Sequence, residues 1–245
     1  MLGKQQDVDK YTALLKKIKD AFCAEYVTPN GRIMSNTQTS YVLALAFDML
    51  PENIRPMAAK HLADDIAGYN NHLTTGFLGT YLLSNTLTRF GYTDVAYKLL
   101  LQDTYPSWLY PVKMGATTIW ERWDGMKTDS TFQTIEMNSF NHYAYGAIGD
   151  WMYKNVAGIN IDSASTGFKK IVIRPRLGGG LTYAKASYES GYGKIAVDWK
   201  IRDEGMFVMD VEIPVNTTAV IYVPGKEGME EVGSGKYHYE TRIRS

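Results

Sequence analysis

The apolar residues of this chain change their period once, close to Gly158, and the change separates two kinds of structure. Before it, apolar residues recur three and four positions apart, as they do on one face of an amphipathic helix. After it, they alternate with polar residues in short runs that end at glycine-containing turns, which is typical of antiparallel strands. We therefore expect a helical region over residues 1–160 and an antiparallel β-sandwich over residues 161–245.

Six helices are predicted in the first region. The helix over residues 8–26 carries one apolar stripe, and Asp7 or Asp9 is placed to cap its start. The stretch 41–50 is almost uninterruptedly apolar, which indicates burial on nearly all sides. The other expected helices cover residues 53–69, 78–90, 93–103 and 138–156, and residues 105–137 are expected to form a loop. These helices present more apolar surface than a simple bundle would cover, so the helical region is predicted to be part of a larger structure.

Six strands are predicted in the second region, which by contrast contains enough strands for a complete sandwich. Gly178-Gly179-Gly180 lacks the Lys-Ser/Thr pair and following helix of a phosphate-binding loop, so we interpret it as a turn. The expected strands cover residues 170–175, 183–188, 194–199, 206–213, 219–223 and 237–243. His238 lies in the last of these strands without a partner that the sequence identifies.

Composition excludes several classes of protein. Lys+Arg and Asp+Glu are equal at 26 each, so net charge does not point to nucleic acid or to an anionic membrane. The single cysteine, Cys23, excludes an internal disulfide and a cysteine-based zinc site. The first ten residues are polar, unlike a signal peptide, and no apolar run approaches a membrane span. We expect a soluble chain that is cytoplasmic as written, or periplasmic or secreted if a longer precursor exists.

The string Trp120-Glu121-Arg122-Trp123, followed by His142, has the residue types of a sugar-cleaving site. Indole rings stack on the apolar faces of a pyranose, and a carboxylate can activate a water molecule. From these residues alone, however, a structural Glu121 paired with Arg122 or with a backbone amide is the more frequent arrangement. A histidine at the start of an aromatic helix is likewise more often a satisfied core residue, so both interpretations stay open.

Longer blocks around these residues closely resemble bacterial α-L-rhamnosidases of the inverting kind. The resemblance rests on segments 115–124 and 141–146, extends to 72–80 and 105–108, and continues in the β region at 190–195. It implies an (α/α)6 barrel of six helical hairpins followed by a β-sandwich. This chain then corresponds to about the C-terminal half of the barrel, over residues 1–160, plus the sandwich over residues 161–245.

The resemblance also implies roles for individual residues. Glu121 matches the general base that activates water, and His142 matches a residue that lines the sugar site. Trp120 and Trp123 flank the base and are expected to shape the pocket, whereas for His72 substrate contact competes evenly with loop shaping. The implied substrate is a rhamnose-containing oligosaccharide or glycoside. No cofactor, metal, nucleic acid or membrane is implied.

The general acid of the family lies in a segment where an Asp-Glu pair is followed closely by a tryptophan. The only Asp-Glu pair here is Asp203-Glu204, in a turn of the β region with no tryptophan near it. The acid is therefore absent, and we predict that the chain alone has little or no rhamnosidase activity. We also expect it to associate, either with a second copy or with the missing half of the barrel.

Three further interpretations are weighed against this one. The chain could be a non-catalytic carbohydrate-binding or scaffold remnant of the same fold, or another inverting (α/α)6 glycosidase. Asp64-Asp65 with His61 one helical turn earlier could suggest a metal site, but a solvated helix face is the better interpretation because no second ligand cluster accompanies it.

Overall fold

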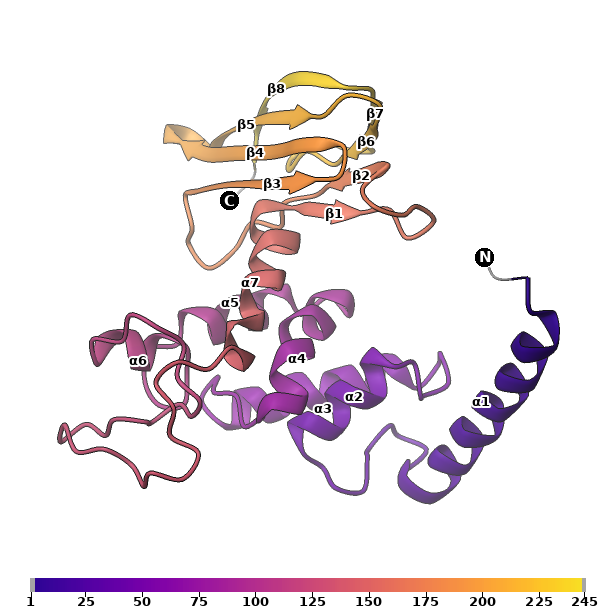
Figure 1. Ribbon diagram of the computed structural model, residues 1–245, viewed down its shortest axis with the longest axis vertical. Coiled ribbons are helices and arrows are strands. Elements are labelled where there is room, and N and C mark those ends of the chain that lie inside the picture. The colour runs from indigo at the N-terminus through magenta and orange to yellow at the C-terminus, as the bar shows by residue number, and fades with distance from the viewer. Residues whose placement is uncertain (1–2, 244–245) are drawn as a thin grey trace. The chain divides into compact units, whose positions relative to one another are not determined.

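The computed structural model describes residues 3–243. It divides into two compact units, Met1–Gly146 and Ala147–Ser245, which we call the helical unit and the β unit (Figure 1). The division lies earlier than the expected boundary at residues 160/161. The reason is that α7 (Ile148–Trp151) and the π-helix η2 (Met152–Ala157) precede the first strand directly, and η2 packs on strands of the β unit.

Five of the six predicted helices form in the helical unit, each within a few residues of its expected bounds. They are α1 (Gln5–Tyr26), α2 (Gln38–Ala46), α3 (Arg55–Gly68), α4 (Phe77–Arg89) and α5 (Thr93–Leu101). A short helix, α6 (Leu109–Lys113), interrupts the segment expected to be loop. Gly91 follows α4 with a φ of 90°, as expected for a residue that ends a helix in the left-handed region.

The sixth predicted helix, over residues 138–156, is wrong in its first part. Residues 138–143 are not helical, and the helical segment begins only at η1 (Ala144–Ala147). The cause is hydrogen bonding to another loop segment: the backbone of Ser139 and that of His142 each bond to residues 119–121. Those bonds hold residues 138–143 in an irregular loop where the apolar pattern alone suggested a helix.

The core of the helical unit lies where α2 packs on α3 and α4, and α4 on α5. Its buried residues are Tyr41, Val42, Ala44, Leu45, Ala58, Ala59, Leu62, Ile66, Leu83, Leu87, Ala96, Tyr97 and Leu99. The prediction that stretch 41–50 is buried on nearly all sides is wrong at Phe47, which caps α2 and is exposed. Helix α1 differs from the others, because none of its residues is buried. Lys4 precedes it, and neither Asp7 nor Asp9 caps it.

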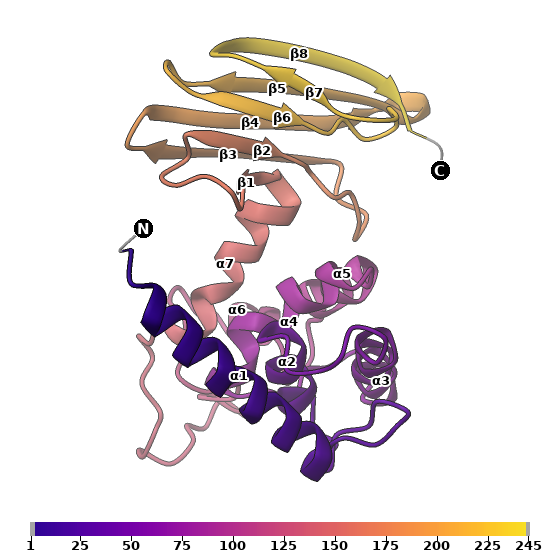
Figure 2. The same cartoon turned by 90° about the vertical axis from the view of Figure 1, so that its right-hand side faces the viewer.

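The β unit consists of two four-stranded sheets, ordered β1-β2-β6-β7 and β3-β4-β5-β8 (Figure 2). The strands are β1 (Ile159–Ile161), β2 (Lys170–Ile173), β3 (Tyr183–Ser190), β4 (Gly193–Arg202), β5 (Met206–Ile213), β6 (Thr218–Ile221), β7 (Glu230–Val232) and β8 (Gly235–Arg242). All six predicted strands form, and two three-residue strands, β1 and β7, were not predicted because they are too short to show a period. The pairing is antiparallel except between β2 and β6, which are parallel.

Alternate residues of the central strands fill the core of the β unit. In β4, Ile195, Val197 and Trp199 are buried while their neighbours face outward. The indole N–H of Trp199 donates to the backbone oxygen of Val156 at 2.8 Å, which ties η2 to the sheet. Gly158 connects η2 to β1 with a φ of 87°, and a Cβ there would lie 2.2 Å from the nitrogen of Pro175. Only glycine fits this position. Within residues 3–243, no helix has the length and apolar composition needed to cross a bilayer.

Candidate active site

The candidate site is built on two segments of the long loop in the helical unit, which lie side by side and run in opposite directions. The backbone N–H of Glu121 donates to the oxygen of Ser139, and that of His142 donates to the oxygen of Ile119, both at 2.8 Å. These bonds bring the segment of Glu121 against the segment of His142. Residues 21 positions apart in the sequence are thereby held in one small region of the unit.

The carboxylate of Glu121 is anchored at one oxygen. Its Oε2 accepts a hydrogen bond from the backbone N–H of Ser139 at 2.9 Å, and the residue is only partly buried. Arg122 does not pair with Glu121, because its Nε bonds Asp124 Oδ1 at 3.1 Å. In the described part of the chain Oε1 makes no hydrogen bond, which leaves it available to accept one from water. The backbone amide carries no net charge, so it orients this carboxylate without compensating its negative charge.

The imidazole of His142 is held between two aromatic rings. Its ring centroid lies 4.8 Å from that of Phe77 with 12° between the planes, and 5.4 Å from that of Tyr143 with 8° between the planes. The backbone N–H of Ala144 lies 3.3 Å from Nδ1. Because a backbone N–H can only donate, Nδ1 acts as the acceptor and a neutral ring carries its proton on Nε2. Nε2–H is then the group that can donate to a hydroxyl.

The two tryptophans that flank Glu121 pack inside the unit. Trp120 is 5% exposed and makes an edge contact with Phe140 at 4.9 Å. Trp123 is 8% exposed and stacks on Tyr145 at 3.7 Å, with Trp108 against it at 84°. Little indole surface remains for a sugar ring to stack on. In this structure the tryptophans support the loop that carries Glu121.

A polar network fixes the turn after Trp123. Asp124 accepts hydrogen bonds from Arg122 and from the amide of Gln133. The amide nitrogen of Asn138 donates to the backbone oxygen of Gly125 at 3.2 Å, and a Cβ added at Gly125 would lie 2.8 Å from Asn138 Oδ1. Gly125 is therefore needed for this close approach. The network connects the turn after Glu121 to the residue before Ser139, and so helps to hold the donor to Glu121 in place.

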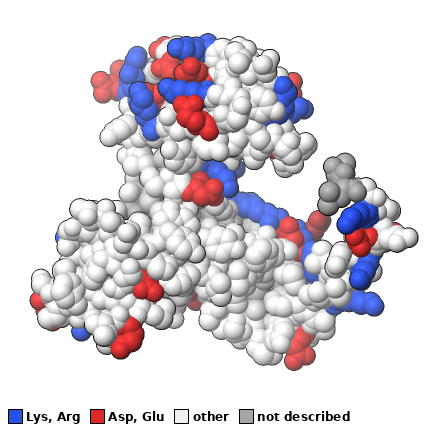
Figure 3. All heavy atoms as spheres, in the orientation of Figure 1, with Lys and Arg blue, Asp and Glu red and all other residues white. Residues whose placement is uncertain are grey.

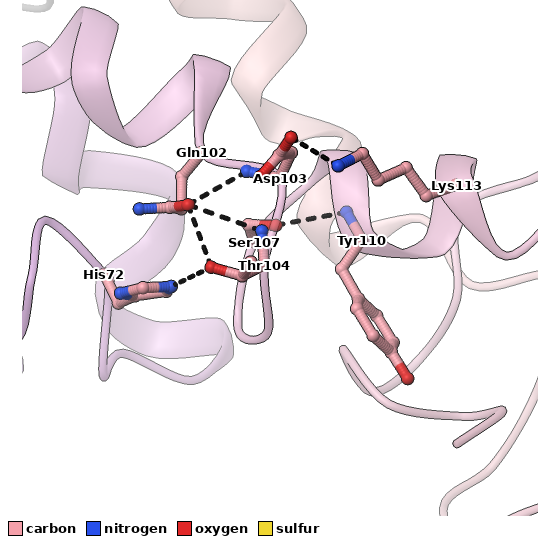
Figure 4. A network of polar contacts seen from close by, with 7 residues as sticks. All are labelled: His72, Gln102, Asp103, Thr104, Ser107, Tyr110 and Lys113. Atoms are coloured by element: carbon pink, nitrogen blue, oxygen red, sulfur yellow. Dashed lines mark hydrogen bonds and ion pairs between the residues drawn. The ribbon is translucent and has the colours of Figure 1, made fainter. Parts of the chain in front are cut away.

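His72 lies in a second network of the helical unit, drawn in Figure 4. Its Nδ1 lies 2.9 Å from the backbone oxygen of Tyr69, and its Nε2 lies 2.8 Å from Thr104 Oγ1. Gln102 then contacts Thr104, and Lys113 forms an ion pair with Asp103. Both ring nitrogens of His72 are thus engaged within the chain, which is what loop shaping requires. Hydrogen bonding by Lys113 also lowers the pKa of Asp103, so this carboxylate stays ionised.

The tyrosines around these loops are held in their neutral form. Burial raises the pKa of Tyr145, and it also raises the pKa of Tyr105 and of Tyr110, where the Asp124 carboxylate adds to the effect. A phenol with a raised pKa can donate a hydrogen bond but is a poorer source of protons near neutral pH. These side chains are therefore unsuited to replace a carboxylic acid as the general acid.

Three contributors to the site were not identified by sequence reasoning. Phe77 lies 65 positions before His142, and nothing in the local pattern links the two rings. The backbone N–H of Ser139 carries no side-chain signal at all. Asn138 was visible as a polar residue between short loop segments, but its function depends on its distance from Gly125.

Comparison with known proteins decides the family. The model described as the bacterial α-L-rhamnosidase six-hairpin glycosidase domain matches residues 1–156, which is more than half of the chain. The model described as the bacterial α-L-rhamnosidase C-terminal domain matches residues 158–238. The chain belongs to the bacterial α-L-rhamnosidase family. Its helices are therefore part of a six-hairpin domain, and its sheets form the C-terminal domain of that family.

Curated relatives and solved structures agree with this family. An α-L-rhamnosidase of Streptomyces avermitilis is 48% identical over 223 residues, which are 91% of this chain and 21% of that protein. An α-L-rhamnosidase of Formosa agariphila is 46% identical over 226 residues, which are 91% of this chain and 24% of that protein.

Two crystal structures have nearly the same fold over the whole chain. The Streptomyces avermitilis α-L-rhamnosidase complexed with L-rhamnose has a TM-score of 0.91 and 43% identity, and the alignment covers 96% of this chain and 24% of that one. The native enzyme from Aspergillus terreus has a TM-score of 0.94 and 36% identity, covering 98% of this chain and 28% of that one. The chain thus spans about a quarter of the length of these relatives.

Proposed function

We propose that this chain carries the water-activating half of an inverting α-L-rhamnosidase site, with Glu121 as the general base. The observation that carries the proposal is the state of the Glu121 carboxylate: one oxygen is fixed by the Ser139 N–H at 2.9 Å, and the other has no hydrogen-bond partner among the described residues. A base of this kind is oriented but not neutralised. Family membership supports a substrate with a terminal α-L-rhamnosyl residue, as does L-rhamnose in the complex of the Streptomyces avermitilis relative.

The proposed step is a single displacement at the anomeric carbon. Glu121 takes a proton from water while the water oxygen bonds to that carbon, and the bond from carbon to the glycosidic oxygen breaks on the opposite face. The departing oxygen must receive a proton from a general acid. In inverting enzymes the acid and the base lie roughly 6.5–9.5 Å apart, so that the water fits beside the sugar.

The other candidate residues have supporting roles in this proposal. His142, with its ring fixed between Phe77 and Tyr143, donates from Nε2 to a sugar hydroxyl. Trp120 and Trp123 do not contact the substrate. They contribute to binding indirectly, by holding the wall of the pocket in place. His72 shapes a neighbouring loop, because both of its nitrogens have partners inside the chain.

The general acid is missing from this chain. Asp203-Glu204 lies in the short turn η3 (Asp203–Gly205) of the β unit, where Glu204 pairs with Arg242 at 3.2 Å. The turn η3 follows β4 directly and connects it to β5 in a hairpin of the sandwich. Since an acid–base group typically contributes about 10²–10⁴-fold to a rate, the chain alone is expected to hydrolyse rhamnosides weakly or not at all.

Hydrolysis of an aryl α-L-rhamnoside and titration with L-rhamnose test the proposal together. We expect negligible turnover, and binding of L-rhamnose that weakens on His142→Ala but not on the control His238→Ala. His238 is a suitable control because it lies on the exposed face of the β unit. Robust turnover that Glu121→Gln abolishes would show that the acid is present after all and would overturn the half-site proposal.

A second candidate is a non-catalytic sugar-binding protein with the same fold, and the absence of the acid favours it. The two candidates differ in what Glu121 does. When the missing half of the domain is supplied, the enzyme candidate requires turnover with inverted anomeric configuration, measured by NMR on the released sugar. Binding of L-rhamnose without turnover under the same conditions would support the non-catalytic candidate.

A further inference from the structure

A small polar pocket lies in the β unit, where the end of η2 meets the strands β1 and β2. It has a volume of about 350 Å³, at the lower end of the range of about 300–1,000 Å³ that is usual for small-molecule sites. Its lining includes three cationic side chains, from Lys154, Arg174 and Arg176, and one carboxylate, from Asp162. All of the lining residues belong to the β unit, and none is part of the candidate active site.

The backbone after β2 brings the two arginines to this pocket. The N–H of Arg174 donates to the oxygen of Gly158, and that of Arg176 donates to the oxygen of Asn155, both at 2.8 Å. These bonds hold the chain after β2 against the end of η2. Pro175 is buried between the two arginines, in the close contact that only a glycine at position 158 permits. The same contact therefore fixes where both guanidinium groups begin.

The carbonyl groups at the end of η2 already accept hydrogen bonds from within the chain. The oxygen of Lys154 accepts from the side-chain amide of Asn160 at 2.6 Å, and the oxygen of Asn155 accepts from the backbone N–H of Arg176. A helix C-terminus otherwise attracts cations through its partial negative charge. Here neutral donors occupy these oxygens, so the helix end offers few acceptors to the basic side chains of the pocket.

Acidic side chains compensate the charge of the pocket only in part. Asp150 pairs with Lys154 at 2.8 Å. Asp162 accepts a hydrogen bond from the backbone N–H of Ala164 at 2.8 Å, and in the described part of the chain it forms no ion pair. On the face of the β unit seen in Figure 3, basic and acidic side chains are interspersed. The pocket differs from that mixed surface, because three of its four charged residues are basic.

The surroundings of the two guanidinium groups are suited to an anion. The guanidinium carbon of Arg174 lies 4.6 Å from the ring centroid of Tyr222, and among residues 3–243 this arginine forms no ion pair. The ring holds one face of the guanidinium and leaves its N–H edge available. Arg176 is partly buried, and burial, followed by the charge of Arg174, lowers the pKa of Arg176. An anion bound at both groups would remove the repulsion between them.

We propose that this pocket binds a small oxyanion, a carboxylate, sulfate or phosphate group, through Arg174 and Arg176. Arginine suits such groups because its planar fork donates two parallel hydrogen bonds to two oxygens. The volume accommodates a small molecule or the end group of a larger one. The proposal goes beyond the hydrolytic site and does not depend on Glu121.

Titration of the whole chain with sodium sulfate, sodium phosphate and sodium D-glucuronate, at constant ionic strength, tests the proposal. We expect saturable binding, with NMR shift changes at the amides of residues 160–163 and 174–176. Arg174→Gln and Arg176→Gln should each weaken binding at least about tenfold, because each removes charge-assisted hydrogen bonds. The matched control is Arg202→Gln, which makes the same change of charge where Arg202 lies 3.7 Å from Glu240, and it should leave the affinity unchanged.

Asp162→Asn provides a test that misfolding cannot imitate. It removes the negative charge of the lining and should tighten binding about two- to fivefold, as expected for a charge pair near solvent. Binding of sulfate and phosphate alone would identify a tetrahedral oxyanion, and binding of D-glucuronate alone would identify a carboxylate carried on a sugar. Either result supports the pocket. No saturable binding of any of the three anions would overturn it, as would equal weakening by Arg174→Gln and Arg202→Gln, which indicates unspecific attraction.

Variants of the helical unit separate this inference from the proposed function. Glu121→Gln and His142→Ala should leave anion binding unchanged, because both residues lie outside the β unit. Saturable anion binding together with no binding of L-rhamnose would leave the pocket in place and remove the proposed sugar site. L-rhamnose binding that His142→Ala weakens, without any anion binding, would do the reverse.

Discussion

Helix α1 and strand β4 have equally regular apolar patterns, but they have opposite surroundings. In β4 every second residue from Ile195 to Trp199 is buried between the two sheets of the β unit. In α1 no residue is buried, although the stripe repeats as faithfully. The difference shows that an amphipathic pattern specifies an element and the face it must cover. It does not specify whether the covering surface belongs to the same chain.

The same difference separates the two units as wholes. The β unit has a core closed by two sheets, in which each buried strand face meets another. The helical unit has a core around α2, α3 and α4, whereas none of the residues of α1 is buried. Substitutions should therefore lower the free energy of unfolding strongly in the core of the β unit and weakly on helix α1. Matched residue types in the two regions allow this to be measured.

The largest expected contrast is between two isoleucines. Ile195→Ala in β4 removes a fully buried side chain and should cost about 2–5 kcal/mol of unfolding free energy. Ile18→Ala in α1 removes a side chain that is 49% exposed and should change stability by no more than about 0.5 kcal/mol. Urea unfolding followed by circular dichroism measures both. Equal losses for the two variants would mean that α1 is packed in solution, contrary to the comparison.

A second contrast compares two glycines that both adopt positive φ. Gly158 has a φ of 87° and the Pro175 nitrogen 2.2 Å from an added Cβ, whereas Gly91 has a φ of 90° and nothing within 4 Å. Gly158→Ala should cost about 2–4 kcal/mol, because backbone strain and overlap add. Gly91→Ala should cost about 1–2 kcal/mol, from the backbone alone. Thermal unfolding of both variants separates backbone strain from steric overlap. If Gly91→Ala costs as much as Gly158→Ala, the backbone around Pro175 must move to relieve the overlap.

The sequence predicted the elements well where a regular period ran over many residues. The strands 206–213 and the helix 78–90 lie within one residue of their observed bounds, because each buries a continuous face. It failed for residues 138–143, where hydrogen bonds to residues 119–121 override the apolar pattern. It also gave no sign of the parallel pairing of β2 with β6, since periodicity carries no information on strand direction.

The candidate site shows the same limit. Glu121 and His142 were identified from the resemblance, and the structure holds their two segments together by backbone hydrogen bonds. The environment of each residue was not predictable, because it depends on groups distant in sequence such as Phe77 and the Ser139 N–H. His238 was assigned no partner, yet strand pairing places Asp210 opposite it with the two side chains 2.7 Å apart.

A smaller effect is expected at the ring that supports His142. Phe77→Ala removes the stack at 4.8 Å, and since aromatic pairs contribute about 0.5–1.5 kcal/mol, the affinity for L-rhamnose should fall about two- to tenfold. Calorimetric titration measures it. Phe47→Ala is the matched control, because this phenylalanine of the same unit follows α2 and is exposed. If both variants lose affinity equally, the loss reflects general loosening of the helical unit rather than the position of His142.

The smallest effect concerns His238 on the exposed face of the β unit. Hydrogen bonds that the His238 ring donates to the Asp210 carboxylate, and then to the Glu240 carboxylate, raise the pKa of His238 above its ordinary value of about 6.5. A raised folded-state pKa means that the charged ring stabilises the β unit fully below about pH 6.5. This contribution is lost as the pH rises through the folded-state pKa. His238→Ala should therefore destabilise the protein more at pH 5.5 than at pH 9, as measured by urea unfolding.

The neighbours of His238 decide how this pH dependence is interpreted. Asp198 faces Asp210 across β4 and β5, and Lys185 pairs with Asp198 at 3.0 Å, so the row has a basic side chain at each end and two carboxylates in the middle. Asp210→Asn should remove most of the pH-dependent difference between wild type and His238→Ala, whereas Lys185→Ala should leave it in place. An equal difference at both pH values would mean that solvent screens the pair completely. The ion pairs on the exposed face of the β unit would then contribute little to the free energy of unfolding.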